Sequence, residues 1–238
     1  MVELAREVVI VPGIIANAYL VGNRESWVLV DAATPGNERK ILRAAEARFG
    51  PGAKPVAILL THGHFDHAGS APPLAARWGV PVFAHALELP YLTGHAHYPP
   101  LDTSKPGFFS MLARFFPSNT VDLGDRVHEF AMEFESWETF NTPGHTPGHV
   151  SFYRPSDGML LAGDALTTMD LDSFWGTIAK RPKVCRPPVP ATMDWVKARE
   201  SVRLLAALRP SVIAAGHGSP MRGAADELQK LADDFVIP

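Results

Sequence analysis

Four short apolar runs, each ending at an aspartate or a histidine, constrain the fold of this chain more than any other feature of its 238 residues. The runs are Trp27–Asp31, Val56–His62, Met159–Asp164 and Val212–His217. Runs of four or five apolar residues bounded by Gly, Pro or polar residues are typical of strands that are buried on both faces. We therefore expect four buried strands whose ends carry the polar side chains.

Helical periodicity is found in three segments that alternate with these runs or follow them. The first segment begins after Asn37, the expected cap, and ends at Gly50-Pro51. The second follows Thr192 and stops at Pro210, and the third runs from Ala224 to Phe235. Strands that are covered by helices imply a layered α/β domain. The chain has no internal repeat and no linker-like stretch, so we expect a single domain over residues 1–238.

The composition excludes several classes of protein. With 46% hydrophobic and 20% charged residues and a net charge of -3, the chain resembles neither a disordered protein nor a nucleic-acid-binding one. The single cysteine, Cys185, cannot form an intramolecular disulfide, and the first residues lack the basic region of a signal peptide. The apolar stretch Val8–Gly22 is interrupted and too short to span a bilayer. We expect a cytoplasmic protein without a membrane partner, and a homo-oligomer is compatible with this composition.

Two stretches, near residues 87–123 and 165–191, do not fit the alternation of strands and helices and are interpreted as insertions. Both are rich in proline, and a long loop inside a compact domain often serves as a lid or a binding loop. Their aromatic residues are candidate substrate contacts: Phe108, Phe109, Phe115, Phe116, Phe174 and Trp175. The alternative is that these rings pin the loops to the core or line a subunit interface.

The segment Thr61-His-Gly-His-Phe-Asp-His-Ala-Gly69 carries the strongest chemical signal in the chain. It places His62, His64, Asp66 and His67 within six residues, and first-row divalent cations accept both imidazole and carboxylate ligands. In an extended or turning segment, residues i and i+2 lie on one side while i+4 and i+5 reach past them. The cluster can therefore serve two neighbouring ions.

Further candidate ligands stand at the ends of other segments. The doubled turn Asn141-Thr-Pro-Gly-His145-Thr-Pro-Gly-His149 offers two histidines, either of which could be a ligand. Asp164 ends an apolar run, where an unpaired carboxylate is costly unless a cation neutralises it. His217 lies between two glycines at the end of the fourth run.

These motifs resemble those of the metallo-β-lactamase superfamily, in order and over the stretch from Asp31 to His217. The resemblance implies an α/β fold, a four-layer αβ/βα sandwich of two mixed sheets with helices outside, and a dinuclear metal site. It assigns His62, His64 and His145 to one ion, and Asp66, His67 and His217 to the other, with Asp164 bridging both. His149 is then a supporting or structural residue. Asp31 is expected to orient the His-rich loop through a hydrogen bond.

The implied function is that of a glyoxalase II-like metallo-hydrolase with two divalent ions per chain, zinc first, with manganese or iron as alternatives. A hydroxide held between the ions would attack an ester, thioester, lactone or related bond of a small, partly apolar substrate. Asp66 and Asp164 are the expected catalytic carboxylates. Aromatic walls beside such a site would favour a substrate with an apolar arm.

The resemblance does not name a substrate, because one fold hosts many reactions. β-Lactamases of this fold are typically secreted and commonly carry a cysteine at the position of Asp164. Glyoxalase II proper adds a helical C-terminal domain, and only 21 residues follow His217. Acyl-homoserine lactonases use a tyrosine downstream of the bridging aspartate, where this chain has none.

Three other functions stay open. Sulfur dioxygenases share the pattern but use one iron, held by two histidines and an aspartate. A metal-dependent nuclease or phosphodiesterase would need a basic surface, which this composition does not provide. A metal-binding module without turnover is disfavoured because no ligand of the pattern is missing.

Overall fold

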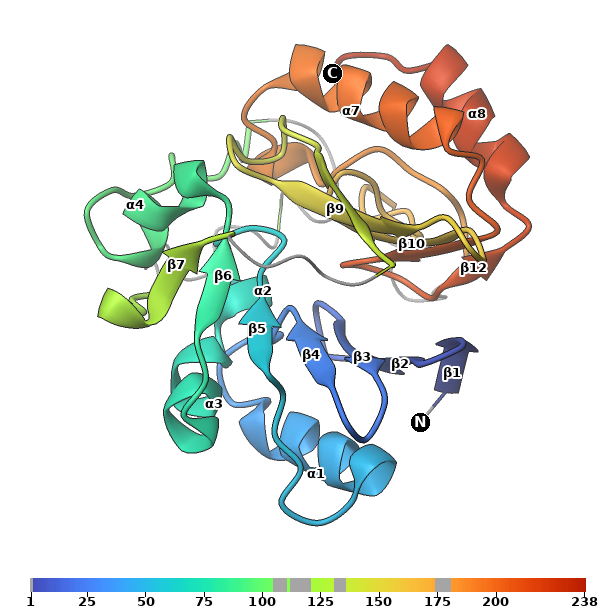
Figure 1. Cartoon of the computed structure of the whole chain (residues 1–238). Helices are drawn as coiled ribbons and strands as arrows, with labels where there is room; N and C mark the ends of the chain where they lie inside the picture. Colours follow the sequence, from blue (N-terminus) through green and yellow to red (C-terminus); the bar gives the residue numbers. More distant parts are fainter. Residues whose placement is uncertain (1, 105–110, 112–120, 131–135, 174–180) are drawn as a thin grey trace. The chain divides into compact units, whose positions relative to one another are not determined.

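The computed structural model describes residues 2–104, 111, 121–130, 136–173 and 181–238 (Figure 1). The chain divides into two compact units: unit 1 comprises Met1–Tyr98 and Asn119–Met132, and unit 2 comprises Pro99–Ser118 and Glu133–Pro238. Each unit has its own sheet and its own apolar core. The single domain expected over residues 1–238 stays a prediction.

Unit 1 is built on a seven-stranded mixed sheet whose spatial order follows the chain. Its strands are β1 (Val2–Ala5), β2 (Val8–Val11), β3 (Ala18–Gly22), β4 (Trp27–Val30), β5 (Ala57–Leu59), β6 (Val82–Ala84) and β7 (Val127–Glu129). The pairs from β1 to β4 are antiparallel, and those from β4 to β7 are parallel. The first two predicted runs are thus adjacent parallel strands, β4 and β5. The apolar stretch Val8–Gly22 forms two further strands.

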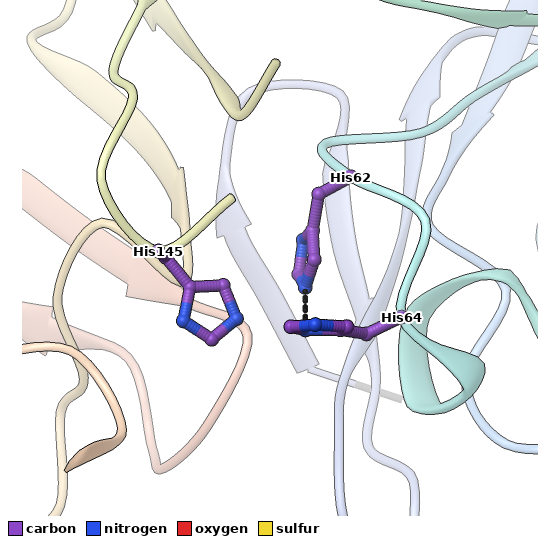
Figure 2. A group of neighbouring side chains, drawn as sticks. All are labelled: His62, His64 and His145. Carbon is purple, nitrogen blue, oxygen red and sulfur yellow. Dashed lines mark hydrogen bonds between the residues drawn. The ribbon is translucent and has the colours of Figure 1, made fainter. Parts of the chain in front are cut away.

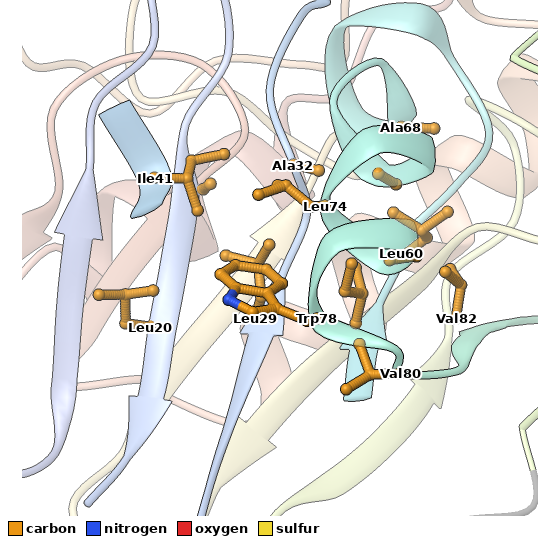
Figure 3. Packing of buried hydrophobic residues seen from close by; sticks show 14 of the residues in the cluster. Leu20, Leu29, Ala32, Ile41, Leu60, Ala68, Leu74, Trp78, Val80 and Val82 are labelled. Atoms are coloured by element: carbon orange, nitrogen blue, oxygen red, sulfur yellow. The ribbon is translucent and has the colours of Figure 1, made fainter. Parts of the chain in front are cut away.

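The helices of unit 1 contribute apolar residues to the core of this sheet. They are α1 (Glu38–Phe49), α2 (Phe65–Ala68), α3 (Ala71–Trp78) and α4 (Leu89–Leu92), with short 3-10 turns η1 (Ala86–Glu88) and η2 (Gly124–Arg126). Figure 3 shows Leu74 and Trp78 of α3 beside Leu29 of β4 in one cluster. Each fully buried leucine or isoleucine contributes about 1.5–3 kcal/mol relative to an exposed one, so this shared core fixes the sheet that carries the His-rich loop.

Helix α1 begins and ends where the sequence predicts, but Asn37 does not cap it with its side chain. The Asn37 amide instead donates hydrogen bonds to Oγ1 of Thr34 at 2.7 Å and to the Thr34 carbonyl oxygen at 3.1 Å. Asn37 thus occupies the N-cap position as predicted, but its side chain stabilises the preceding turn and makes no capping bond. The helix ends at Gly50, whose φ of 109° lies in the left-handed region that favours glycine.

Unit 2 is built on a five-stranded mixed sheet. Its spatial order is β12 (Met221–Arg222), β11 (Val212–Ala215), β10 (Met159–Gly163), β9 (Val150–Arg154) and β8 (Glu138–Asn141). The pair β10 and β11 is parallel, and the other pairs are antiparallel. The third and fourth predicted runs are therefore the adjacent parallel strands β10 and β11.

Two helices, α7 (Trp195–Ala207) and α8 (Ala225–Asp233), cover one face of this sheet (Figure 1). Val202 and Leu228 of these helices share a buried cluster with Ile213 of β11. Helix α7 follows Thr192 as predicted, and its capping residue is Asp194, which accepts hydrogen bonds from the backbone N–H groups of residues 196 and 197. A 3-10 turn, η3 (Val189–Ala191), precedes it. Among the described residues, every helix is too short or too polar to cross a membrane.

Candidate metal centre

The His-rich motif lies where strand β5 gives way to helix α2. His62 and His64 lie on the connection, and His64 occupies the position before the first residue of α2 in an extended conformation. Asp66 and His67 lie within α2, and the N–H of His67 donates to the His64 carbonyl oxygen at 3.0 Å. The sharp change from strand to helix brings side chains from both parts of the motif to the same end of the sheet.

The ring of His62 lies against the rings of His64 and His67. Nε2 of His62 lies 3.0 Å from Nδ1 of His64 (Figure 2), and the His62 and His67 ring centroids are 4.2 Å apart. Two imidazole nitrogens on one tetrahedral zinc ion would lie about 3.3 Å apart, given Zn–N bonds of about 2.0–2.1 Å. The His62–His64 spacing therefore fits two ligands of one divalent cation.

Asp31 controls which nitrogen each of two histidines presents. Its carboxylate accepts a hydrogen bond from Nδ1 of His67 at 2.8 Å, so the proton of that ring lies on Nδ1. Asp31 also accepts from the Thr61 hydroxyl at 2.9 Å, and that oxygen lies 3.1 Å from Nδ1 of His62. Because the hydroxyl proton is directed to Asp31, its oxygen accepts from His62. Both rings thus present Nε2, as ligand histidines with a carboxylate partner do.

The backbone of Asp31 is itself strained, with a φ of 57°. Few residues other than glycine adopt this conformation, although aspartate does so more often than most. Its N–H donates to the Leu59 carbonyl oxygen at 2.9 Å, and the Thr61 N–H donates to its carboxylate at 2.8 Å. These bonds tie the end of β4 to the end of β5, and the strain is of the kind that collects at functional sites.

Unit 2 carries a second cluster, centred on Asp164. This residue follows β10, His217 lies just beyond β11, and His145 lies in the connection between β8 and β9. Oδ2 of Asp164 lies 3.0 Å from Nε2 of His217 and 3.5 Å from Nε2 of His145. All three side chains are almost completely buried. One carboxylate oxygen is therefore shared between two histidines from separate connections.

Gly144 explains how His145 is held in this cluster. A Cβ atom at Gly144 would lie 2.3 Å from the backbone nitrogen of Ala198, so only glycine lets the turn approach α7 this closely. The Gly144 carbonyl oxygen accepts hydrogen bonds from the N–H groups of Met193 and Asp194 at 2.9 and 2.8 Å. The turn that carries His145 is thus fixed to the start of α7.

His149, the other histidine of the doubled turn, has both ring nitrogens bonded to protein. Its Nε2 accepts a hydrogen bond from the backbone N–H of Asp164 at 2.8 Å, so the ring proton lies on Nδ1. Nδ1 then donates to the Thr142 hydroxyl at 2.8 Å. The chain of bonds continues to Ser151 at 2.9 Å and ends at the carbonyl oxygen of Ala162 at 3.0 Å. These contacts support Asp164 and favour His145 over His149 as a ligand.

Two further polar residues adjoin the His-rich loop, and the sequence did not single them out. Glu88 is completely buried, and its Oε2 accepts a hydrogen bond from the N–H of Gly63 at 2.9 Å. The Tyr98 hydroxyl donates to the same oxygen. Burial, followed by the nearby Glu88 charge, raises the pKa of Tyr98 well above its usual range, so its hydroxyl stays protonated.

The donor chemistry of the two clusters suits a first-row divalent cation. The residues that could hold an ion are drawn from His62, His64, Asp66, His67, His145, Asp164 and His217. Imidazole and carboxylate donors match zinc, manganese and iron, and the buried carboxylates need a positive partner. The predicted substrate contacts Phe108, Phe109, Phe115, Phe116, Phe174 and Trp175 lie outside the described residues.

Comparison with known proteins shows where this arrangement belongs. Residues 11–217 match the model of the metallo-beta-lactamase superfamily. The probable metallo-hydrolase YflN of Bacillus subtilis strain 168 is 38% identical over 218 residues, which cover 88% of this chain and 83% of YflN. The hydroxyacylglutathione hydrolase of Enterobacter sp. strain 638 is 35% identical over 147 residues, which cover 62% of this chain but only 45% of that protein.

Solved structures agree with the sequence matches. The metallo-beta-lactamase family protein TTHA1429 from Thermus thermophilus has a TM-score of 0.67 at 24% identity, covering 97% of this chain and 80% of that chain. TTHA1623, solved in a di-iron-bound form, has a TM-score of 0.61 at 30% identity, covering 94% and 97%. The two mixed sheets with their helices are those of the αβ/βα sandwich, as predicted. The chain therefore belongs to the metallo-β-lactamase superfamily, as one of its hydrolases.

Proposed function

We propose that the chain binds two divalent metal ions and hydrolyses an ester, thioester or lactone bond in a small substrate. The first ion would be held by His62, His64 and His145, which Figure 2 draws, and the second by Asp66, His67 and His217, with Asp164 as a ligand of both. The observation that carries this proposal is the position of Asp164. Its Oδ2 lies within 3.5 Å of His145 and 3.0 Å of His217, the histidines assigned to different ions.

When bound, two such ions would supply a water of lowered pKa as the nucleophile and would polarise the acceptor oxygen of the substrate. Residues of the chain prepare this chemistry. Asp31 keeps protons on Nδ1 of His67 and, through Thr61, on Nδ1 of His62, so that Nε2 of each ring can donate its lone pair. Asp66, which is 7% exposed, is assigned to bind metal and to orient the attacking water. His149 holds the backbone of Asp164.

The bond class is supported by a named relative, the hydroxyacylglutathione hydrolase of Enterobacter sp. strain 638. Because the alignment covers less than half of that protein, its substrate is not carried over to this chain. We propose an acyl substrate with an apolar arm, on the ground that the sequence between the ligand motifs is rich in aromatic residues. Zinc is the proposed metal, with iron and manganese included in the test. A cytoplasmic location is proposed because Cys185 needs no oxidising compartment.

The test is an activity panel of esters, thioesters, lactones, phosphodiesters and β-lactams on protein of measured zinc, manganese and iron content. We expect turnover of at least one acyl substrate, loss with a chelator, and recovery when metal is returned. Asp66→Asn should lower kcat by a factor of about 10²–10⁴, the range of a lost acid or base. Asp125→Asn, an exposed aspartate in η2 of the same unit, is the matched control and should leave kcat unchanged.

Two results would contradict the proposal. The first is fully metal-loaded protein that hydrolyses no member of the panel. The second is protein that carries one iron and consumes oxygen with a persulfide substrate, which would make the chain a dioxygenase. An equal loss in Asp66→Asn and Asp125→Asn would remove the role assigned to Asp66.

A further inference from the structure

A buried carboxylate in unit 1 bonds to the backbone between two of the proposed ligands. Glu88 lies at the end of η1, and its side chain has no exposed surface. Its Oε2 accepts a hydrogen bond from the N–H of Gly63 at 2.9 Å. Gly63 is the residue between His62 and His64. Burying a carboxylate costs free energy unless hydrogen bonds compensate for the lost hydration, and the Gly63 N–H supplies one such bond.

Tyr98 completes a closed set of three hydrogen-bonding groups. Its hydroxyl donates to Oε2 of Glu88, and the same hydroxyl oxygen lies 3.1 Å from the Gly63 nitrogen. The Gly63 N–H is therefore shared between a carboxylate and the hydroxyl that the carboxylate holds. Such a set fixes the orientation of the Gly63 peptide, since a rotated peptide would lose both acceptors at once.

The ring of Tyr98 also contacts a proposed ligand directly. Its centroid lies 4.5 Å from that of the His64 ring, at an interplanar angle of 62°. On another side, Tyr98 stacks on Tyr91 with centroids 4.0 Å apart and an angle of 8°. The hydroxyl is thus bonded to Glu88, and the ring contacts both Tyr91 and His64. Rotation of the His64 ring is restricted by this contact.

The space around Gly63 fits this arrangement closely. A Cβ atom at Gly63 would lie 2.5 Å from the Tyr98 hydroxyl oxygen and 3.2 Å from Cδ2 of Leu92. Any larger residue would push the tyrosine away from Glu88. A side chain at position 63 would therefore compete with the Tyr98 hydroxyl for the same volume.

We propose that Glu88 and Tyr98 form a positioning pair that presets His62 and His64 for metal binding, by fixing the Gly63 peptide and packing against the His64 ring. This inference rests on the proposed metal site. Neither residue touches the metal or the substrate in this account. Their effect is on the affinity of the site for its cation, as is typical of groups that orient metal ligands.

The first experiment measures metal affinity by competition with a chromophoric chelator, using Zn²⁺ and Co²⁺ and the full chain. Tyr98→Phe keeps the ring but removes the hydroxyl, and it should weaken binding of one ion by about 10-fold or more. Glu88→Gln keeps an acceptor oxygen but removes the charge. It should therefore lower the metal affinity less than Tyr98→Phe does. Tyr91→Phe is the matched control, because it removes a hydroxyl from the stacked ring outside the three-group set. It should bind metal as the wild type does.

The second experiment is made on metal-free protein, so its readout does not depend on metal binding. The ring ¹⁵N resonances of His62 and His64 and the amide proton of Gly63 should shift in Tyr98→Phe and Glu88→Gln, and should stay unchanged in Tyr91→Phe. Wild-type protein that binds no metal would overturn the proposed function, and the proposal for Glu88 and Tyr98 would fall with it even if these resonances shift. If the wild type binds metal, unshifted resonances would overturn the positioning pair alone.

A purely structural role gives a different combination of results. It predicts a lower melting temperature for Tyr98→Phe with an unchanged metal affinity and an unchanged Co²⁺ absorption spectrum. That combination would overturn the positioning role. A weakened affinity and an altered Co²⁺ spectrum at an unchanged melting temperature would support it.

Discussion

The Asp31 carboxylate accepts a hydrogen bond from Nδ1 of His67 at 2.8 Å, and both side chains are completely or almost completely buried. The same carboxylate accepts from Thr61, which in turn bonds to His62. The buried Asp31 carboxylate therefore sets the tautomers of two proposed ligands, His62 and His67. This gives Asp31 an effect on metal binding without contact with the metal.

Replacing Asp31 by asparagine should weaken metal binding by about 10–100-fold, because an amide cannot accept from Thr61 and His67 as a carboxylate does. Asparagine also tolerates the positive φ of this position, so the change tests the side chain and leaves the backbone conformation intact. Titration with a competing chelator measures the effect, and Asp125→Asn serves as the control. An Asp31→Asn protein with wild-type affinity would show that the bond to His67 is dispensable.

The two histidines of the doubled turn should respond differently to substitution. His145→Ala should remove a ligand and leave about one ion per chain in elemental analysis. His149→Ala should keep both ions at saturating metal but lower the free energy of unfolding by about 1–3 kcal/mol, because the buried N–H of Asp164 loses its acceptor. Denaturant unfolding of the metal-free proteins measures the second effect. The reverse pattern, with metal lost only in His149→Ala, would exchange the roles of the two histidines.

The sequence predicts the framework of the site well, for a physical reason. Strands such as β4 and β10 are continuous apolar runs. The polar residue that follows each run, Asp31 or Asp164, marks the end of the strand. Buried parallel strands leave this signal in the order of residues alone. The dense His-rich motif is likewise visible because its residues are close in sequence.

Contacts that depend on packing between distant segments could not be predicted. Glu88 and Tyr98 come from a stretch without regular periodicity, and an isolated glutamate or tyrosine carries no spacing signal. The hydrogen bonds of the His149 ring could not be predicted either. The ring bonds to Thr142, which bonds to Ser151, and these two residues lie on or at the end of adjacent antiparallel strands. The missing side-chain capping bond of Asn37 has a similar cause, because its amide donates to Thr34 in the preceding turn.

Cys185 should react slowly with thiol reagents. Burial raises the pKa of its thiol to about 11, so very little thiolate is present near neutral pH. At pH 8 we expect modification by a disulfide reagent about two orders of magnitude slower than for a free thiol with a pKa of about 8.5. Any stability that comes from this shift is present below about pH 8.5 and is lost as the pH rises towards 11. The urea-unfolded chain is the control, and equal rates in folded and unfolded protein would contradict the burial of this thiol.

The central claim, two metal ions joined by Asp164, is tested most directly by counting metal ions per chain. Elemental analysis of wild-type protein, equilibrated with zinc, manganese or iron(II) and freed of excess metal, should give about two ions per chain. Asp164→Ala should give one ion or fewer, because removing the carboxylate leaves two cations without the negative charge between them. A wild-type value near one that no added metal increases, or two ions retained in Asp164→Ala, would contradict the account.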